Sequence, residues 1–147
     1  MKLIPISLDS KLNAAFEAHP DCKESLQMSI DFFTRVGYVT PWIGYYAKLN
    51  NEFVGSAAFK GKPEDKKVEI AYGTFRKYEG KGIGTEICRQ LVLLAVETDP
   101  EIKITARTLP EENASASILR KNGFIFLGNV WDEEDGNVWE WEYQGHQ

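Results

Sequence analysis

Apolar and polar residues alternate through the middle of the chain, a period of two that is typical of β-strands with one buried face. The alternation begins in "WIGYYAKL", residues 42–49, and Asn50-Asn51 then suits a tight turn into residues 52–61. After the loop "GKPED", a third alternating run covers residues 66–75. Residues 42–75 therefore predict a three-stranded antiparallel meander.

Apolar positions three and four apart predict two helices before this meander, behind a short first strand at residues 2–8. The first, over residues 9–19, would be capped by Asp9 or Ser10 and separated from the second by Pro20. The second, over residues 22–37, would end at Gly37.

The second half of the chain alternates strands and helices. A helix from Ile83 towards Pro100 lies between strands at residues 68–75 and 102–108, so these two strands should be parallel and joined by a right-handed crossover. A short helix at residues 113–123 and a hairpin at 124–143 close the chain. The predicted fold class is a mixed α/β sheet, mostly antiparallel with one parallel βαβ pair and helices on both faces, in a single domain over residues 1–147.

Composition narrows the function classes. A length of 147 residues suits one domain, and the net charge of −5 argues against a nucleic-acid or anionic-membrane footprint. No apolar run approaches the roughly 20 residues of a membrane span. Cys22 and Cys88 form no paired CxxC motif and the chain has only two histidines, His19 and His146, so we expect no metal site and a reduced, cytoplasmic protein.

Glycines at positions 80, 82 and 84 stand where a strand passes into a helix. A helix N-terminus offers unpaired N–H groups and partial positive charge, and glycines allow a ligand close to that backbone. An anion site and a simple sharp turn both account for them. The phosphate motif GxxxxGK[ST] fails because Phe75 stands five residues before Gly80, and GxGxxG fails because Thr85 and Ile87 are not glycines.

The stretch from Glu79 to Gly84 fits instead the pattern [Q/R]xxGx[G/A], with Glu79 in place of Gln or Arg. It resembles the GNAT superfamily of acyl-CoA N-acyltransferases. "VEIAYGTFRKYEGKG" looks like that family's fourth strand and its run-in to the pyrophosphate loop. "TLPEENASASILRKNGF" is similar to the ribosomal-protein-alanine N-acetyltransferase-like branch, and the order of elements agrees across nearly the whole chain.

The resemblance implies a V-shaped opening between the strands at residues 68–75 and 102–108, in which acetyl-CoA lies as the co-substrate. Pantetheine amides would pair with the first strand like an added strand, the pyrophosphate would take N–H groups of the glycine stretch, and Asn113 would contact the cofactor. The implied cofactor-binding residues are Ala71, Tyr72, Gly73, Thr74, Phe75, Gly80, Lys81, Gly82, Ile83, Gly84, Thr85 and Asn113.

Two residues are candidates for the chemistry. Glu69 matches a recurring glutamate of the branch and would take a proton from the attacking ammonium, unless it is a structural residue paired with Lys66 or Lys67. The family's usual tyrosine acid falls on Leu119, so Ser115 becomes the candidate donor to the leaving thiolate. Cys88 is expected to be structural rather than a nucleophile, and Trp131, Trp139 and Trp141 to pack in the core and the hairpin.

The predicted activity is acetyl transfer to a primary amine, and a non-catalytic acyl-CoA-binding module is the alternative. The acceptor would be a small molecule or a protein N-terminus, in a pocket shaped by the helices at residues 9–35 and by the closing hairpin. Glu17, Glu24 and Asp31 suit a cationic acceptor there. Exposed edge strands are compatible with a homodimer.

Glu79 leaves two accounts open, because a carboxylate repels a pyrophosphate. It faces away as a charge early in the helix while Arg76, Lys77 or Lys81 supplies the cation, or it weakens cofactor binding. The nearby basic residues favour the first account.

Overall fold

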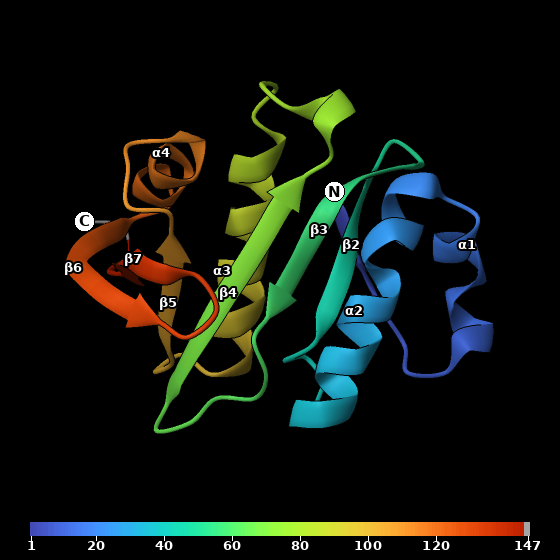
Figure 1. Cartoon of the computed structure of the whole chain (residues 1–147), viewed down its shortest axis with the longest axis horizontal. Helices are drawn as coiled ribbons and strands as arrows, with labels where there is room; N and C mark the ends of the chain where they lie inside the picture. Colours follow the sequence, from blue (N-terminus) through green and yellow to red (C-terminus); the bar gives the residue numbers. More distant parts are fainter. Residues whose placement is uncertain (146–147) are drawn as a thin grey trace.

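A seven-stranded mixed sheet forms the centre of the computed structural model, which describes residues 1–145 (Figure 1). The order of strands across the sheet is β1-β2-β3-β4-β5-β7-β6. Within the described residues, β4 and β5 are the one parallel pair. The strands are β1 (Lys2–Pro5), β2 (Gly44–Leu49), β3 (Glu52–Phe59), β4 (Lys67–Thr74), β5 (Lys103–Thr108), β6 (Phe124–Asp132) and β7 (Gly136–Tyr143).

Helices cover both faces of the sheet, which confirms the predicted fold class. Figure 1 shows α2 in front of the strands and α3 behind them. On α3, Ile87, Cys88 and Leu91 are completely buried in the main core. The helices are α1 (Ala14–Glu17), α2 (Pro20–Val36), α3 (Ile83–Thr98) and α4 (Ala114–Lys121), with 3-10 turns at Ser10–Asn13 and Arg76–Tyr78.

The predicted meander and the parallel pair are both present. Asn50 and Asn51 turn β2 into β3 with φ of 51° and 65°, the left-handed conformation that this short hairpin requires. The C-terminal hairpin is also present, but β7 lies between β5 and β6. Its antiparallel pairing with β5 runs from Thr105 opposite Glu142 to Thr108 opposite Trp139.

The single helix predicted over residues 9–19 is wrong. The structure has a 3-10 turn followed by the one-turn α1, because the buried Asn13 side chain bonds the Ser7 backbone rather than extending a helix. Its Nδ2 donates to Ser7 O at 2.7 Å, and its Oδ1 accepts from Ser7 N–H at 3.0 Å. Pro20 begins α2 rather than standing before it, since the first helical turn needs no proline N–H.

Candidate active site

β4 and β5 separate halfway along their length. The parallel ladder joins Lys67–Ile70 to residues 103–106, but β4 continues to Thr74. Over this extension the described ladder pairs β4 only with β3, from Ile70 opposite Phe59 to Thr74 opposite Gly55. The predicted V-shaped opening is therefore confirmed, and it leaves one backbone edge of residues 71–74 available to an extended amide-bearing ligand.

The three glycines have two different roles. Gly80 and Gly82 both have φ of +77°, and a Cβ added to either would meet no atom within 4 Å. Gly84 is a close-packing position, because an added Cβ would lie 2.7 Å from Ile118 Cδ1 and 3.1 Å from Thr74 Oγ1. Two glycines thus allow a left-handed turn with open space beside it, and the third lets α3 approach α4 and β4.

The turn places backbone N–H groups that lack a helical acceptor beside that open space. The Glu86 N–H donates to Gly82 O at 3.2 Å as α3 begins. The N–H groups of residues 83–85 precede this bond and have no intrahelical acceptor. Together with the helix dipole they make an anion-binding end.

A cavity of about 540 Å³, the wedge cavity, joins the open edge of β4 to the glycine turn and α4. Of the predicted cofactor-binding residues it is lined by Tyr72, Gly73, Thr74, Gly80, Gly82, Ile83, Gly84 and Thr85. It is also lined by Tyr78, Glu79, Ala114, Ser115, Ser117, Ile118 and Lys121.

Four predicted cofactor residues are not part of this lining. Ala71 lines a neighbouring cavity, and Phe75 stacks near His19 with ring centroids 6.1 Å apart. Lys81 lies over the ring of Tyr78, with Nζ 6.0 Å from the centroid. Asn113 caps α4 by accepting the Ala116 N–H at 2.9 Å, and its expected contact with the cofactor stays a prediction.

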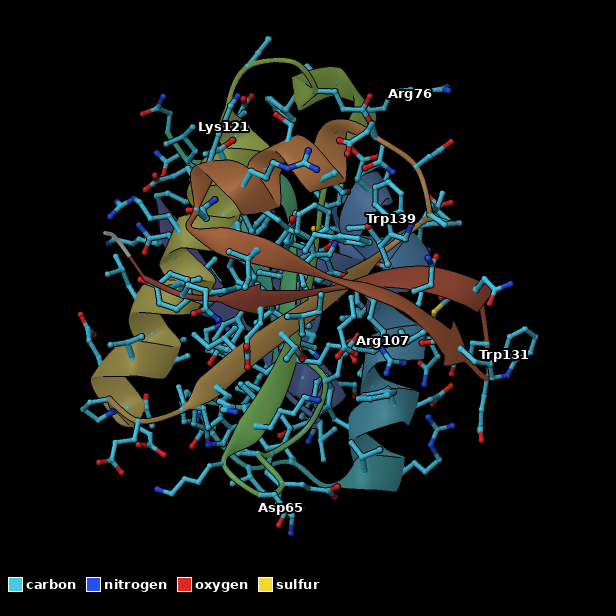
Figure 2. The ribbon with its side chains drawn as sticks, turned by 90° about the vertical axis from the view of Figure 1, so that its left-hand side faces the viewer. Asp65, Arg76, Arg107, Lys121, Trp131 and Trp139 are labelled. Carbon is cyan, nitrogen blue, oxygen red and sulfur yellow. The ribbon has the colours of Figure 1, made fainter. Side chains whose placement is uncertain are left out.

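The charges around the wedge cavity differ from the favoured expectation. Glu79 lines the cavity and precedes α3, whose first turn has Glu86 as its acidic residue. Glu79 therefore stands before the first turn of α3 rather than within it. The cation in the lining is Lys121, at the end of α4 (Figure 2). Sequence reasoning missed Lys121 because it stands about 40 positions after the glycine motif.

A second cavity of about 310 Å³, the α2 cavity, lies between α2 and the sheet. Met28, Ser29 and Phe32 of α2 line one side, and Ser56, Ala58 and Ala71 of the sheet line the other. Tyr72 lines both cavities, so they meet at this residue. No residue of the closing hairpin is among the described lining residues of this cavity.

Two hydroxyls lie where the cavities meet. Ser115 lines the wedge cavity from the first turn of α4, as expected for a residue near the thiol. Tyr72 Oη donates to the carbonyl oxygen of Ser115 at 3.5 Å, and burial, together with nearby Cys88, raises the pKa of Tyr72. Leu119 is completely buried in the core. The side chain of Tyr72 thus reaches the same region from β4, which only the three-dimensional arrangement reveals.

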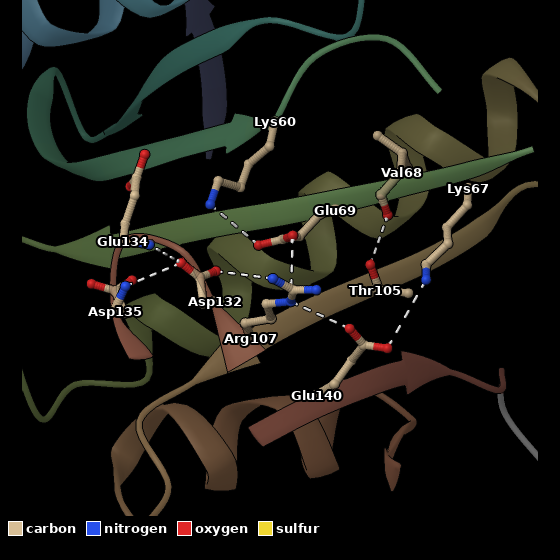
Figure 3. Close-up of polar contacts among 10 residues, drawn as sticks. All are labelled: Lys60, Lys67, Val68, Glu69, Thr105, Arg107, Asp132, Glu134, Asp135 and Glu140. Atoms are coloured by element: carbon tan, nitrogen blue, oxygen red, sulfur yellow. Dashed lines mark hydrogen bonds and ion pairs between the residues drawn. The ribbon is translucent and has the colours of Figure 1, made fainter. Parts of the chain in front are cut away.

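Glu69 is part of an ion-pair network that spans β4, β5 and β7 (Figure 3). Its carboxylate lies 3.4 Å from Lys60 Nζ and 3.9 Å from Arg107 Nε. The predicted alternative partners are wrong, because Lys66 pairs with Asp99 and Lys67 pairs with Glu140.

Arg107 is the centre of this network. Its guanidinium also contacts Asp132 at 2.9 Å and Glu140 at 3.3 Å. The N–H of Glu134 and this guanidinium lower the pKa of Asp132 to about 2. Glu69 lines a third cavity of about 220 Å³ together with Lys60, and Lys60 also lines the α2 cavity. Glu69 is thus next to the α2 cavity, and its carboxylate contacts two cations, Lys60 and Arg107.

Comparison with known proteins identifies the family to which this fold belongs. The family model described as the acetyltransferase (GNAT) domain matches residues 9–125. The chain belongs to this GNAT family.

Three matches, one to a curated protein and two to structures of AAC(6')-Ib, give the extent of the likeness. The chain is 33% identical over 79 residues to the uncharacterized N-acetyltransferase YjdG of Bacillus subtilis (strain 168), a match covering 53% of this chain and 47% of that protein. AAC(6')-Ib in complex with ribostamycin and coenzyme A matches with 26% identity and a TM-score of 0.61, over 69% of this chain and 63% of that one. The complex of AAC(6')-Ib with acetyl-CoA matches with 21% identity and a TM-score of 0.69, over 97% and 92%. The chain thus spans about half the length of the curated relative it matches.

The remaining candidates of this GNAT domain have structural roles, with one exception. Burial raises the pKa of Cys88 to about 12, so a reactive thiolate is disfavoured there. Trp141 is buried and donates from Nε1 to Thr108 Oγ1 at 3.0 Å. Trp131 is 70% exposed at the tip of the hairpin, where Figure 2 shows it pointing outward, so its expected packing in the hairpin is wrong.

No group of three or more His, Cys, Asp or Glu side chains in the described part of the chain is placed to hold a metal ion. His146, considered in the metal argument, lies outside the described residues. None of the described helices is long and apolar enough to cross a bilayer.

Proposed function

We propose that this GNAT domain transfers the acetyl group of acetyl-CoA to a primary amine. One observation carries the proposal: the open edge of β4 leads from the glycine turn to Tyr72, where the α2 cavity begins. A cofactor with a pyrophosphate at one end and a thioester at the other suits this path. An amine in the α2 cavity would then meet the thioester at Tyr72.

The reaction assigns a role to each group along that path. The amine nitrogen attacks the thioester carbonyl carbon, the C–S bond breaks, the nitrogen loses a proton and the thiolate gains one. N–H groups of residues 83–85 would bind the pyrophosphate, and Lys121 would add a positive charge. Glu69 would receive the amine proton through water, and Ser115 or Tyr72 would donate to the sulfur.

Two measurements test the proposal. Coenzyme A should stabilise the folded chain by about 2.7 kcal/mol at a hundredfold excess over Kd, a rise in Tm of roughly 5–11 °C for a protein of this size. Acetyl-CoA plus an accepted amine should release free thiol. Stabilisation without thiol release on any amine would favour the non-catalytic module, for which the substitutions at Glu79 and Leu119 argue.

A matched pair of glycine variants separates cofactor binding from backbone strain. Gly82 and Gly37 both have positive φ and open space at the position of a Cβ, so alanine strains the backbone at both. The strain is about 1–2 kcal/mol at Gly82, which is in the left-handed region. It is larger at Gly37, because a φ of 108° with a ψ of 146° is essentially restricted to glycine. Gly82→Ala should also weaken coenzyme A binding, whereas Gly37→Ala, at the end of α2, should not. Equal coenzyme A affinities in the two variants would contradict the placement of the pyrophosphate.

The proposal extends to the setting of the protein and to its partners. Two buried cysteines without a disulfide agree with a cytoplasmic setting, and the acidic composition with a partner other than nucleic acid. A homodimer and a single domain over residues 1–147 stay predictions.

A further inference from the structure

The α2 cavity has an unusual chemical character for a site that receives amines. Apolar groups dominate its lining, in which Met28, Phe32 and Phe33 of α2 lie opposite small residues on the facing side of the sheet, Gly44, Ala58 and Ala71. Two tyrosine hydroxyls are already engaged within the protein. Tyr46 Oη donates to Cys22 O at 2.7 Å, and Tyr45 Oη donates to Pro41 O at 2.6 Å.

Lysine, not a carboxylate, is the charged residue in the described lining. Lys60 stands at one end of the α2 cavity, and its ammonium pairs with Glu69 outside it. The acidic residues expected to attract a cationic acceptor are all exposed and none lines the cavity: Glu17, Glu24 and Asp31. That expectation is therefore wrong for this cavity.

This lining discriminates between amines by charge. An attacking amine must lose its proton, so the reacting nitrogen is neutral when it enters the chemistry. A second ammonium on the same molecule stays charged and would be buried among apolar groups without a carboxylate partner, which is strongly unfavourable. Polyamines and aminoglycosides carry such additional ammonium groups, and the nearby Lys60 would repel them.

The size of the cavity sets a second limit. A volume of about 310 Å³ is at the lower end of the range for ligand pockets. It suits one aromatic ring with a short alkyl chain better than several linked sugar rings. An apolar body between α2 and the sheet would extend its amine towards Tyr72, where the wedge cavity begins.

We infer that the acceptor is a primary amine on a small, uncharged, apolar body, such as an arylalkylamine, rather than a polyamine or an aminoglycoside. The inference rests on the proposed acetyl transfer and narrows its substrate. The cavity selects this class through its apolar walls and its lack of a carboxylate in the described lining.

Initial rates of thiol release test the inference. With acetyl-CoA saturating, 2-phenylethylamine should give a kcat/KM at least about tenfold above those of 1,4-diaminobutane, spermidine and ribostamycin. Equal or higher values for the polycationic amines would overturn the inference and leave the proposed function standing. Coenzyme A stabilisation with no thiol release from 2-phenylethylamine would overturn it too. Absence of coenzyme A stabilisation would instead overturn the proposed function itself.

A charge placed in the cavity floor sharpens the test. Ser56→Asp supplies the missing carboxylate beside Ala58 and Ala71, so the preference for 2-phenylethylamine over 1,4-diaminobutane should fall by about tenfold or more. Asn51→Asp makes the same change in charge at the exposed β2–β3 turn and should keep the preference of the unmodified chain. Retained coenzyme A stabilisation would show that Ser56→Asp is folded. An unchanged preference in that folded variant would contradict the assignment of the cavity.

Discussion

The wedge cavity and the α2 cavity meet at Tyr72, but they are built in different ways. The wedge cavity consists largely of backbone from one continuous run, the end of β4, the glycine turn and the start of α3, with α4 closing its side. The α2 cavity lies between α2 and the three strands that follow it in the sequence, β2, β3 and β4, and its character depends on their side chains. One site presents N–H groups, and the other presents apolar walls.

This difference explains why one site is readable from sequence and the other is not. A backbone site depends on conformation, so it leaves glycines at fixed spacing, and Gly80 and Gly82 indeed have the left-handed φ that the motif requires. A side-chain pocket depends on which faces meet across the fold. The chemistry of the α2 cavity emerges only when Phe32 and Ala71 are placed opposite one another.

The largest effect should come from Glu69, which pairs with Lys60 of the α2 cavity lining and with Arg107. We predict that Glu69→Gln lowers kcat by roughly 10²-fold, the low end for general base catalysis, with little change in coenzyme A affinity. Steady-state rates of thiol release and calorimetric titration with coenzyme A measure the two quantities.

Glu140→Gln is the matched control for this variant. Glu140 also contacts Arg107, at 3.3 Å, but lines none of the three described cavities. Its loss should weaken the network while leaving kcat within about threefold. Similar losses in both variants would mean that Glu69 acts by holding Arg107 in place, and normal turnover in Glu69→Gln would mean that the amine loses its proton to solvent.

The sequence predicted most of the fold but not the partners of Glu69. Local patterns sufficed for the meander, for the βαβ unit and for the closing hairpin. Insertion of β7 beside β5 is a choice between sheet edges that alternation does not encode, and it brings Glu140 to Arg107. Lys60 reaches Glu69 because β3 and β4 are neighbours in the sheet, whereas Lys66 and Lys67, close in sequence, extend elsewhere.

An intermediate effect should distinguish the two hydroxyls at the junction of the cavities. We predict that Ser115→Ala lowers kcat about tenfold, less than the full range for a general acid, because Tyr72 and water remain near the sulfur. Tyr72→Phe should have a smaller effect, since burial raises the pKa of this hydroxyl and it already donates to Ser115 O. Single-turnover acetyl transfer measures the chemical step directly.

The leaving thiol provides the control for these variants. An acyl-CoA analogue with a more acidic thiol needs less protonation as the thiolate leaves. The variant that lacks the proton donor should therefore recover activity with this analogue. If Tyr72→Phe is the more damaging change and recovers in this way, the assignment of Ser115 is wrong. If neither variant changes the rate, water protonates the thiolate.

The last effect is on cofactor affinity rather than on the rate, and it concerns Glu79, the carboxylate in the lining of the wedge cavity. Because the proposed pyrophosphate site lies at this end of the cavity, we predict that Glu79→Arg tightens coenzyme A binding by about 1–2 kcal/mol, the scale of a partly exposed charge near a helix end. The gain should decrease as salt is raised, since exposed charges are screened. Calorimetric titration with coenzyme A at two ionic strengths measures it.

Glu134→Arg reverses the same charge on the exposed β6–β7 turn, so its Kd for coenzyme A should change by less than about twofold. Lys121→Ala should weaken binding, because this lysine is the cation in the lining. An unchanged Kd in Glu79→Arg would restore the account in which Glu79 faces away from the phosphates. A large loss of affinity would mean instead that Glu79 holds the glycine turn in shape, and then the wedge cavity, like the α2 cavity, would depend on a side chain that the motif does not specify.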